Sequence, residues 1–375
     1  MKTKALFISI FLISGLLYGQ KKDSIVPFHI GMAFPLSTNG HEAPNLVNST
    51  SIHFLTAYSA GVDGMEVTGF ASIVKGDVKG IQASGILNIA EGKLNGLQGA
   101  GTVNIVEGHL QGVQGSGIIN MANSVHGVQG AGVINMTEGK MHGLQGAGTA
   151  NVADSVYGMQ GSGFVNVANH VQGFQGAGFL NVAKNVEGVQ AAGFINIADS
   201  CDYPLAPINI IKNGKMVLHA WTNLQQDINL SFKSGGRKTY GVIGIGINPF
   251  FKELEFGTHL GLGYNCHLSK SFVLSIEAVN TVYFSQNELE EYNKLAHDKK
   301  SMKHETNSGS LNLILDYQPV RWLGITAGPS ISYMHTNNKA RFDCIENPIW
   351  DNVNTSKEQY DNVWLGFTAG VYYRF

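Results

Sequence analysis

Apolar and polar residues alternate with a period of two through most of the chain, as in β-strands that turn one face towards an apolar environment. Between residues 227 and 233, for example, Ile228, Leu230 and Phe232 alternate with polar side chains. The same alternation recurs at residues 28–36, 52–58, 240–250, 254–264, 272–284, 311–317 and 323–333. The sequence therefore predicts an all-β fold.

The last strand of this pattern, residues 363–375, has an apolar side chain at every second position and ends in an aromatic residue. Strands of about 9–11 residues with alternating faces, separated by polar loops, are typical of outer-membrane β-barrels. A soluble β-sandwich shares the alternation, but the strand lengths and the final strand favour an antiparallel barrel. Val371, Tyr373 and Phe375 are expected to be the signal that the outer-membrane insertion machinery reads during biogenesis.

The middle of the chain is an internal repeat of 15–16 residues with the pattern G-x-Q-x-x-G-x-x-N-x-A. A weaker copy, with Gly64 and Glu66 in the matching places, precedes the regular ones. The Gln column consists of Gln82, Gln98, Gln114, Gln129, Gln145, Gln160, Gln175 and Gln190. The Asn column consists of Asn88, Asn104, Asn120, Asn135, Asn151, Asn166, Asn181 and Asn196. Extra residues enter only at polar turns between copies, which hold nearly all of the array's charge.

Two folds fit this array, and both give the strands one dry face, such as the one that carries Val128, Ile134 and Met136. In an antiparallel meander of the barrel, each copy is one long strand. In a β-solenoid, each copy is a coil of two short strands bent at the Gly-rich segment. The solenoid is favoured because every copy is alike and the short turns lack the Asn-Gly or Asp-Gly of two-residue hairpins. Parallel stacking would also place the Gln and Asn amides about 4.8 Å apart, in ladders.

The first residues predict export. Lys2 and Lys4 precede an apolar run at residues 5–17, which is shorter than the about 20 residues of a membrane-spanning helix. Residues 1–19 are therefore expected to be a cleaved signal peptide. The other predicted domains are first barrel strands at 20–61, the repeat array at 62–200 and C-terminal barrel strands at 201–375. The array would then be inserted into an outer-membrane barrel of roughly 8–12 strands, with membrane lipid as a partner.

Several segments resemble Gram-negative surface-repeat outer-membrane proteins. They are AYSAGVDGMEV at residues 57–67, the array itself, DYPLAPINIIKNG at 202–214 and SGGRKTYGVIGIGINP at 234–249. The resemblance covers most of the chain and implies location and architecture, because the family supplies no established activity. The G-x-x-N-x-A half of each copy also resembles the curlin repeat of bacterial surface amyloid, a β-solenoid with Gln and Asn ladders. The period here is shorter, and the Gln lies three residues before the Gly rather than two.

Composition narrows the possible partners. The chain has 25 Lys and Arg against 27 Asp and Glu, so no basic field attracts nucleic acid. Charged residues make up only 14% of the chain, below the roughly 25% of soluble globular proteins. This low charge agrees with contact with lipid, but no motif identifies a surface partner.

No motif predicts a catalytic, cofactor-binding or metal site. The Gly-rich segment of the repeat lacks the Lys-Ser/Thr of a phosphate loop, and the array has no Asp column of the kind that binds calcium. His126 and His142 share a column whose other members are ordinary solvated side chains. Cys201, Cys266 and Cys344 are too far apart for a metal cluster and are expected to be structural or free. The basic segment at 297–304 is expected to lie in a solvated extracellular loop.

Three classes of function are open. A non-enzymatic surface protein with a structural or interaction role is favoured, because catalysis needs a unique cluster of groups whereas repetition supplies an extended surface. A small-solute channel or transporter is the alternative, although the lumen of a barrel of about ten strands is mostly filled by side chains. A hydrolase in the barrel comes third, since no G-x-S-x-G motif or comparable constellation supports it.

Overall fold

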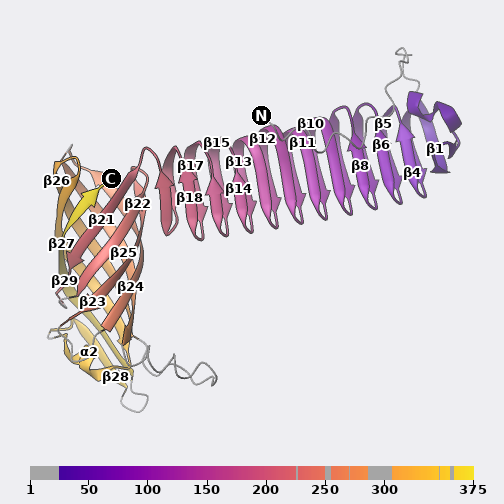
Figure 1. Cartoon of the computed structure of the whole chain (residues 1–375). Coiled ribbons are helices and arrows are strands. Elements are labelled where there is room, and N and C mark those ends of the chain that lie inside the picture. Colours follow the sequence, from indigo (N-terminus) through magenta and orange to yellow (C-terminus); the bar gives the residue numbers. More distant parts are fainter. Residues whose placement is uncertain are drawn as a thin grey trace. The chain divides into compact units, whose positions relative to one another are not determined.

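The computed structural model describes residues 25–224, 227–249, 255–269, 271–285, 306–345, 347–354 and 359–375. The predicted signal peptide and the basic segment at 297–304 lie outside these residues. The chain divides into two compact units, residues 1–116 and 117–375, and the described residues of both lie mostly in strands (Figure 1). The predicted fold class is confirmed: the protein is all-β and combines a β-solenoid with a closed antiparallel barrel.

The first unit is a stack of parallel coils. Its strands are β1 (Ile25–Ala33), β2 (Leu36–Ser37), β3 (Val47–His53), β4 (Thr56–Ser59), β5 (Gly61–Thr68), β6 (Ala71–Val74), β7 (Val78–Ser84), β8 (Leu87–Ala90), β9 (Leu94–Ala100) and β10 (Val103–Ser116), with the 3-10 helix η1 at Gly40–Asn45. β3, β5, β7 and β9 pair in parallel along one side, and β4, β6 and β8 along another. β10 is long because its first half pairs with β8 and its second half with β9.

The second unit begins with coils of the same kind. Their strands are β11 (Ile119–Ala131), β12 (Ile134–Ala147), β13 (Ala150–Ser162), β14 (Val165–Val167), β15 (His170–Ala177), β16 (Leu180–Val182), β17 (Asn185–Ala192), β18 (Ile195–Ala198), β19 (Ser200–Leu205) and β20 (Ile208–Ile211). Equivalent residues of successive repeats are register partners, as Gln129 and Gln145 are in the β11–β12 pair. This parallel stacking, about 11 turns over the described residues, is the solenoid and excludes the meander.

The second unit then closes a barrel of eight strands. They are β21 (Lys215–Thr222), β22 (Ile228–Gly235), β23 (Thr239–Asn248), β24 (Glu255–His267), β25 (Phe272–Ser285), β26 (Thr306–Val320), β27 (Leu323–Thr336) and β29 (Gln359–Arg374). Neighbours are antiparallel, and β21 pairs with β29 to complete the ring. Helix α2 (Lys339–Asp343) and strand β28 (Trp350–Asn354) lie between β27 and β29 in the sequence.

The expectation that residues 20–61 supply barrel strands is wrong for the part described. β1, β3 and β4 pair in parallel with each other or with the next coil strands. β19 and β20 likewise extend the array to Ile211. An alternating pattern is the same in a coil and in a barrel, so only the pairing partner distinguishes them.

The apolar parity of the repeat lies on the outside of the coils. Val128 and Met136 are each 40% exposed, whereas Val156, Gln160 and Asn166 are fully buried. The core is therefore lined by one aliphatic residue, the two amides and a small residue from each repeat. Amides are tolerated there because their neighbours along the stack satisfy them.

The stacking distance also requires glycine at fixed places in each repeat. Gly143 has a φ of 123°, which is unfavourable for residues with a Cβ. A Cβ at this position would lie 2.1 Å from the carbonyl oxygen of Gly127 in the preceding coil. Gly158, Gly173 and Gly188 have a positive φ at the same place in later coils.

Candidate functional site

The predicted Gln column forms a hydrogen-bonded ladder inside the coils. Gln145 Nε2 donates to Gln129 Oε1 at 2.8 Å, and Gln160 Nε2 donates to Gln145 Oε1 at 2.9 Å. Gln175 and Gln190 continue the series with the same geometry. Every Gln and Asn of the two columns is at most 2% exposed, so the structure places both predicted columns in the interior of the coils.

The Asn column forms a second ladder that donates in the opposite direction. Asn135 Nδ2 donates to Asn151 Oδ1 of the following coil at 2.9 Å and to the carbonyl oxygen of Gly146 at 2.6 Å. Its own Oδ1 accepts from Asn120 Nδ2 at 3.0 Å. Each Asn thus ties the side chains of adjacent coils to the bend of the backbone.

The barrel caps the C-terminal end of both ladders. Asn196 Nδ2 donates to Asn209 Oδ1 at 2.9 Å, and the backbone N–H of Asn209 donates to Ser234 Oγ on β22 at 2.9 Å. In the Gln column the register partner of Gln190 is Pro204. The carbonyl oxygen of Pro204 accepts a hydrogen bond from Thr239 Oγ1 on β23 at 2.8 Å. The last coil is therefore bonded directly to two barrel strands.

A carboxyl group ends the Gln ladder in the first unit. Gln82 Nε2 donates to Ser72 Oγ at 2.7 Å, and Ser72 Oγ donates to Glu66 Oε1. Glu66 is the register partner of Gln82 and is fully buried. Burial raises the pKa of Glu66, and hydrogen bonds from serine hydroxyls oppose this only in part.

Two buried imidazoles, those of His29 and His53, lie in the coils that precede Glu66 in the chain. The ring centroids of His29 and His53 are 4.3 Å apart. His29 Nδ1 lies 3.0 Å from Asn48 Nδ2, which can only donate, so the Nε2 proton points to Ser37 Oγ at 3.0 Å. Burial lowers the pKa of His29 to about 4, with a further contribution from His53, and burial also lowers the pKa of His53. Both rings are thus neutral parts of a polar core.

Ion pairs fill the interior of the barrel. Lys233 Nζ is paired with Glu277 Oε1, and Tyr240 Oη donates to the same oxygen at 2.6 Å. Lys215 Nζ lies 2.8 Å from Asp316 Oδ2. All these groups line one cavity of about 10 Å³, room for about one water molecule.

A third pair lies in another part of the lumen. Arg341, from helix α2, lies 3.4 Å from Asp227 Oδ1, and its guanidinium carbon is 3.6 Å from the ring centroid of Tyr283. Tyr283 Oη donates to Asp227 Oδ2 at 2.8 Å. Arg341 and Tyr283 also line a cavity of about 10 Å³. Sequence reasoning missed these lumen pairs, although Asp227 and Lys233 stand in the polar parity of their strand.

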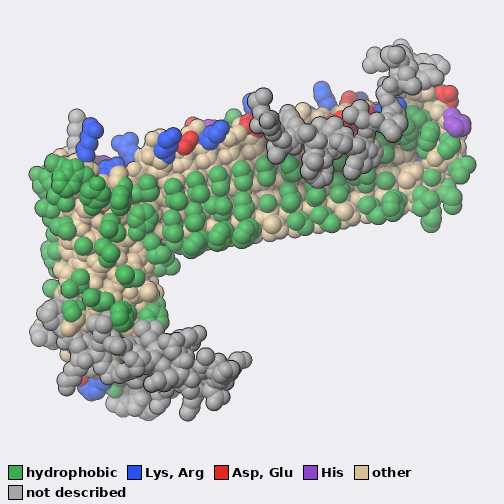
Figure 2. Space-filling view, viewed as in Figure 1, with side chains coloured by type: hydrophobic (Ala, Val, Ile, Leu, Met, Phe, Trp, Pro, Cys, Tyr) green, Lys and Arg blue, Asp and Glu red, His purple; other side chains and the backbone are tan. Residues whose placement is uncertain are grey.

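The outer wall of the barrel is apolar. Val371, Tyr373 and Phe375, the predicted insertion signal, point outwards and are 51%, 50% and 71% exposed. Trp364 and Tyr372, on the opposite parity of β29, are 6% and 3% exposed. Figure 2 shows further hydrophobic side chains over the barrel strands. This is the inverse of a water-soluble β-protein, whose apolar parity faces a core.

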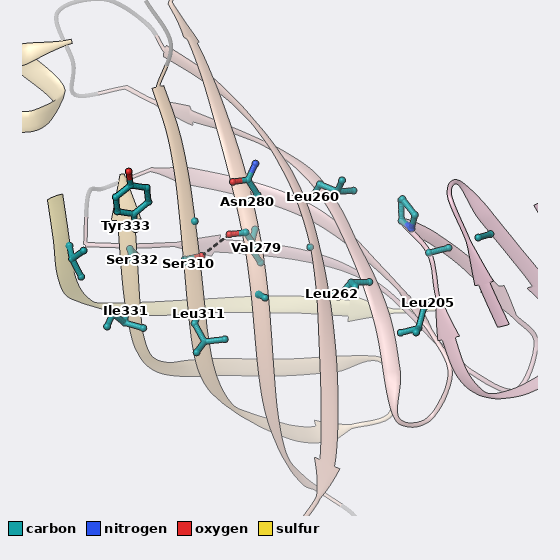
Figure 3. Close-up of a pocket in the computed structure, with 17 residues that line it drawn as sticks. Leu205, Leu260, Leu262, Val279, Asn280, Ser310, Leu311, Ile331, Ser332 and Tyr333 are labelled. Atoms are coloured by element: carbon teal, nitrogen blue, oxygen red, sulfur yellow. Dashed lines mark hydrogen bonds between the residues drawn. The ribbon is translucent and has the colours of Figure 1, made fainter. Parts of the chain in front are cut away.

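An apolar groove of about 740 Å³ opens where the last coil meets this wall (Figure 3). Leu205 lines it on the coil side, and Leu260, Leu262 and Leu311 line it on the barrel side. The close approach depends on Gly241, because a Cβ there would lie 2.2 Å from the carbonyl oxygen of Ala206. The groove is therefore a continuation of the barrel's apolar exterior.

The remaining candidates for chemistry are dispersed. The rings of His126 and His142 are stacked with centroids 5.8 Å apart and an interplanar angle of 22°. Among the described residues, no group of three or more His, Cys, Asp or Glu could hold a metal ion. Cys201, Cys266 and Cys344 form no disulfide with one another, and burial raises the pKa of Cys201 to about 12.

Fold and site together define an all-β protein with a side-chain-filled barrel and an amide-laddered solenoid. No helix within the described part of the chain combines the length and apolar character needed to cross a membrane. Comparisons of the chain with protein-family models, curated proteins and solved structures gave no match.

Proposed function

We propose that this chain is a non-enzymatic outer-membrane protein in which the barrel is an anchor and the solenoid is an extended surface for structural or binding contacts. The proposal includes the export and the kinship with surface-repeat proteins that the sequence leads us to expect. The observation that carries it is the combination of a filled lumen with an apolar outer wall.

The outer wall supports the membrane location. Leu365 is 67% exposed and Leu260 is 52% exposed, while Lys233 and Glu277 are buried inside. A barrel with aliphatic side chains outside and charges inside needs an apolar medium around it. In water, a continuous apolar wall of this kind would make the barrel aggregate.

The filled lumen of the barrel favours a membrane anchor rather than a channel. The interior of an eight-stranded barrel is just wide enough for its side chains, and here the cavities beside the Lys233–Glu277 and Arg341–Asp227 pairs measure about 10 Å³ each. A solute would have to separate buried ion pairs in order to pass, at a cost of several kcal/mol for each charge left unpaired.

The solenoid supports a contact function. Each repeat presents equivalent outward positions, and the variation among polar residues is concentrated at the turns and in the column of His126, His142 and Tyr157. A surface of this kind suits an extended partner that makes many equivalent contacts.

Planar-bilayer recording with the refolded full-length chain tests the anchor. We expect no steady conductance from protein that resists alkaline extraction from vesicles. Channels of defined size would overturn the anchor and support the small-solute channel. Recovery of the chain in the supernatant after alkaline washing would overturn the membrane location itself.

A further inference from the structure

Charged and apolar side chains are segregated around the coils of the second unit. The turns between repeats form a charged edge, the turn edge, which contains Glu138, Lys140, Asp154, Lys184 and Asp199. The bend between the two strands of each repeat forms the other edge, the apolar edge, which contains Ile118, Val133, Thr149, Phe164, Phe179 and Phe194. Figure 2 shows charged side chains along one edge of the coils and rows of hydrophobic side chains below them.

The apolar edge is exposed and organised. Phe164, Phe179 and Phe194 are 51%, 38% and 42% exposed. The first two rings stack with centroids 4.9 Å apart, and the second pair with centroids 5.2 Å apart. The adjoining short strands carry only aliphatic side chains outwards, as Val165 and Val167 do in β14. An exposed apolar edge that runs without charge along several coils indicates a contact site rather than a surface that faces solvent.

The apolar edge continues onto the outer wall of the barrel. Ile208 is the register partner of Ile195, so Pro207 takes the place of Phe194 in the last coil. Pro207 lines the apolar groove together with Leu260 and Leu311 of the barrel. Whatever medium covers the barrel wall therefore meets the start of the apolar edge.

From this continuity we infer that the apolar edge lies in the acyl-chain region of the leaflet that surrounds the barrel, with the turn edge in water. The inference rests on the proposed function, since it takes the barrel to be embedded in a membrane. Lipid is favoured over a second copy of the chain because the groove joins the edge to a wall that lipid already covers. An amphipathic element of this type lies with its apolar side some 5–10 Å deep in the interface.

Depth-dependent quenching tests this in the full-length chain. Single cysteines would be introduced at Thr149 (Thr149→Cys, apolar edge), Ser155 (Ser155→Cys, turn edge) and Leu365 (Leu365→Cys, barrel wall), in a background in which the native cysteines are replaced. Each would carry an environment-sensitive fluorophore, in phosphatidylcholine vesicles with or without brominated acyl chains. We expect several-fold stronger quenching at Thr149→Cys and Leu365→Cys than at Ser155→Cys.

The probe on the barrel wall separates the two proposals. Quenching at Leu365→Cys without quenching at Thr149→Cys would overturn the inference and leave the membrane anchor standing. Equal quenching at Thr149→Cys and Ser155→Cys would also overturn it, because the coils would then have no preferred edge. An unquenched Leu365→Cys probe would overturn the anchor and the inference together. Self-quenching at Thr149→Cys that disappears on dilution with unlabelled protein would assign the edge to a second copy.

Discussion

At the scale of single residues, the coils bury amides and a carboxyl by giving most of them partners at fixed positions. Asn135 shows the principle, since it donates to Asn151 and Gly146 and accepts from Asn120. A buried polar group of this kind adds little net stability when satisfied, but leaving its partners unsatisfied is expensive. The consequence is that single substitutions in the ladder act on three coils at once.

Asn135→Leu should destabilise the coils. It removes the donor to Gly146 O and to Asn151 Oδ1, and each buried group left without a partner costs about 1–3 kcal/mol. Chemical denaturation followed by circular dichroism would measure the loss in free energy of unfolding. Met136→Leu is the matched control, because Met136 is the next residue and points outwards; its effect should stay within about 0.5 kcal/mol.

Gly143→Ala should be far more damaging than Gly146→Ala. At Gly143 the positive φ and the 2.1 Å approach of the Gly127 carbonyl oxygen both oppose a Cβ, whereas nothing lies within 4 Å of a Cβ at Gly146. A Gly→Ala change is stabilising by about 0.4–1 kcal/mol where the backbone accepts it and destabilising by more than that where φ is positive. Equal thermal midpoints for the two variants would contradict this account of the stacking.

Acid should weaken the N-terminal coils through His29. Its pKa is about 4 in the folded chain and 6.5 in the unfolded chain, so between these values the unfolded state binds more protons. The stability it contributes is complete above pH 6.5 and is lost as the pH falls towards 4, with a slope of up to about 1.4 kcal/mol per pH unit.

The neighbouring Glu66 acts with the opposite sign. Its raised pKa means that its contribution is complete below pH 4.5 and is lost as the pH rises. Both the wild type and His29→Gln contain Glu66, so the difference between their stabilities at each pH cancels the contribution of Glu66. What remains is the contribution of the His29 imidazole. Hydrogen exchange of the N-terminal coils should show a smaller acid effect in His29→Gln, and an unchanged acid effect would sink the prediction. His126→Gln, on the outside of the array, should behave as the wild type.

At the scale of elements, the turns absorb variation while the strands keep their register. The β11–β12 and β12–β13 pairs shift register only at the turns, between Ala122 and Val125 and between Thr137 and Lys140. Repeats of 15 and 16 residues can therefore stack without a break in either ladder. The length of a repeat is thus set by its strands and adjusted at one place.

One extra glycine between Asp154 and Ser155 should be tolerated, because neighbouring copies already differ in length there. One extra glycine between Gln160 and Gly161 should not, since it shifts the following residues of β13 to the opposite face. Thermal unfolding of the two insertion variants compares them directly. Similar midpoints would show that register within the strands does not hold the coils together.

At the scale of the whole molecule, the barrel keeps its charged pairs inside and its apolar side chains outside. Lys233, Glu277, Lys215 and Asp316 occupy the lumen, and the outer wall is left to aliphatic and aromatic side chains. Buried pairs add little net stability compared with apolar residues, but they are costly to break singly. The barrel should therefore respond very differently to single and double removal of a pair.

Lys233→Met should destabilise the barrel by about 3–5 kcal/mol because it leaves the carboxylate of Glu277 unpaired. Adding Glu277→Gln should recover most of that loss. Unfolding in detergent micelles, followed by tryptophan fluorescence, would measure both variants. Lys339→Met is the control, since the Lys339–Asp343 pair is largely exposed and such pairs are worth about 0–1 kcal/mol. Additive effects of the two lumen substitutions would argue against a coupled pair.

The sequence by itself determined those features of the fold that follow from a periodic pattern of residues. Alternation with a period of two predicted the all-β class, the identical Gln and Asn columns favoured parallel ladders over a meander, and the apolar parity of residues 363–375 favoured a barrel strand over a strand of a soluble sandwich. Each of these is a repeating local property, because neighbouring side chains of a strand point to opposite faces whatever the strand pairs with.

Only the tertiary structure decided the pairing partners and which face of each strand lies inside. β1 and β3 share the alternation of barrel strands yet belong to the coils. Val128 and Met136 look like core residues yet lie outside, because the amides fill the interior. Lys233 and Glu277 are 44 residues apart in the chain and meet only because the ring closes. Contacts across such separations depend on the closed sheet, and no local pattern encodes them.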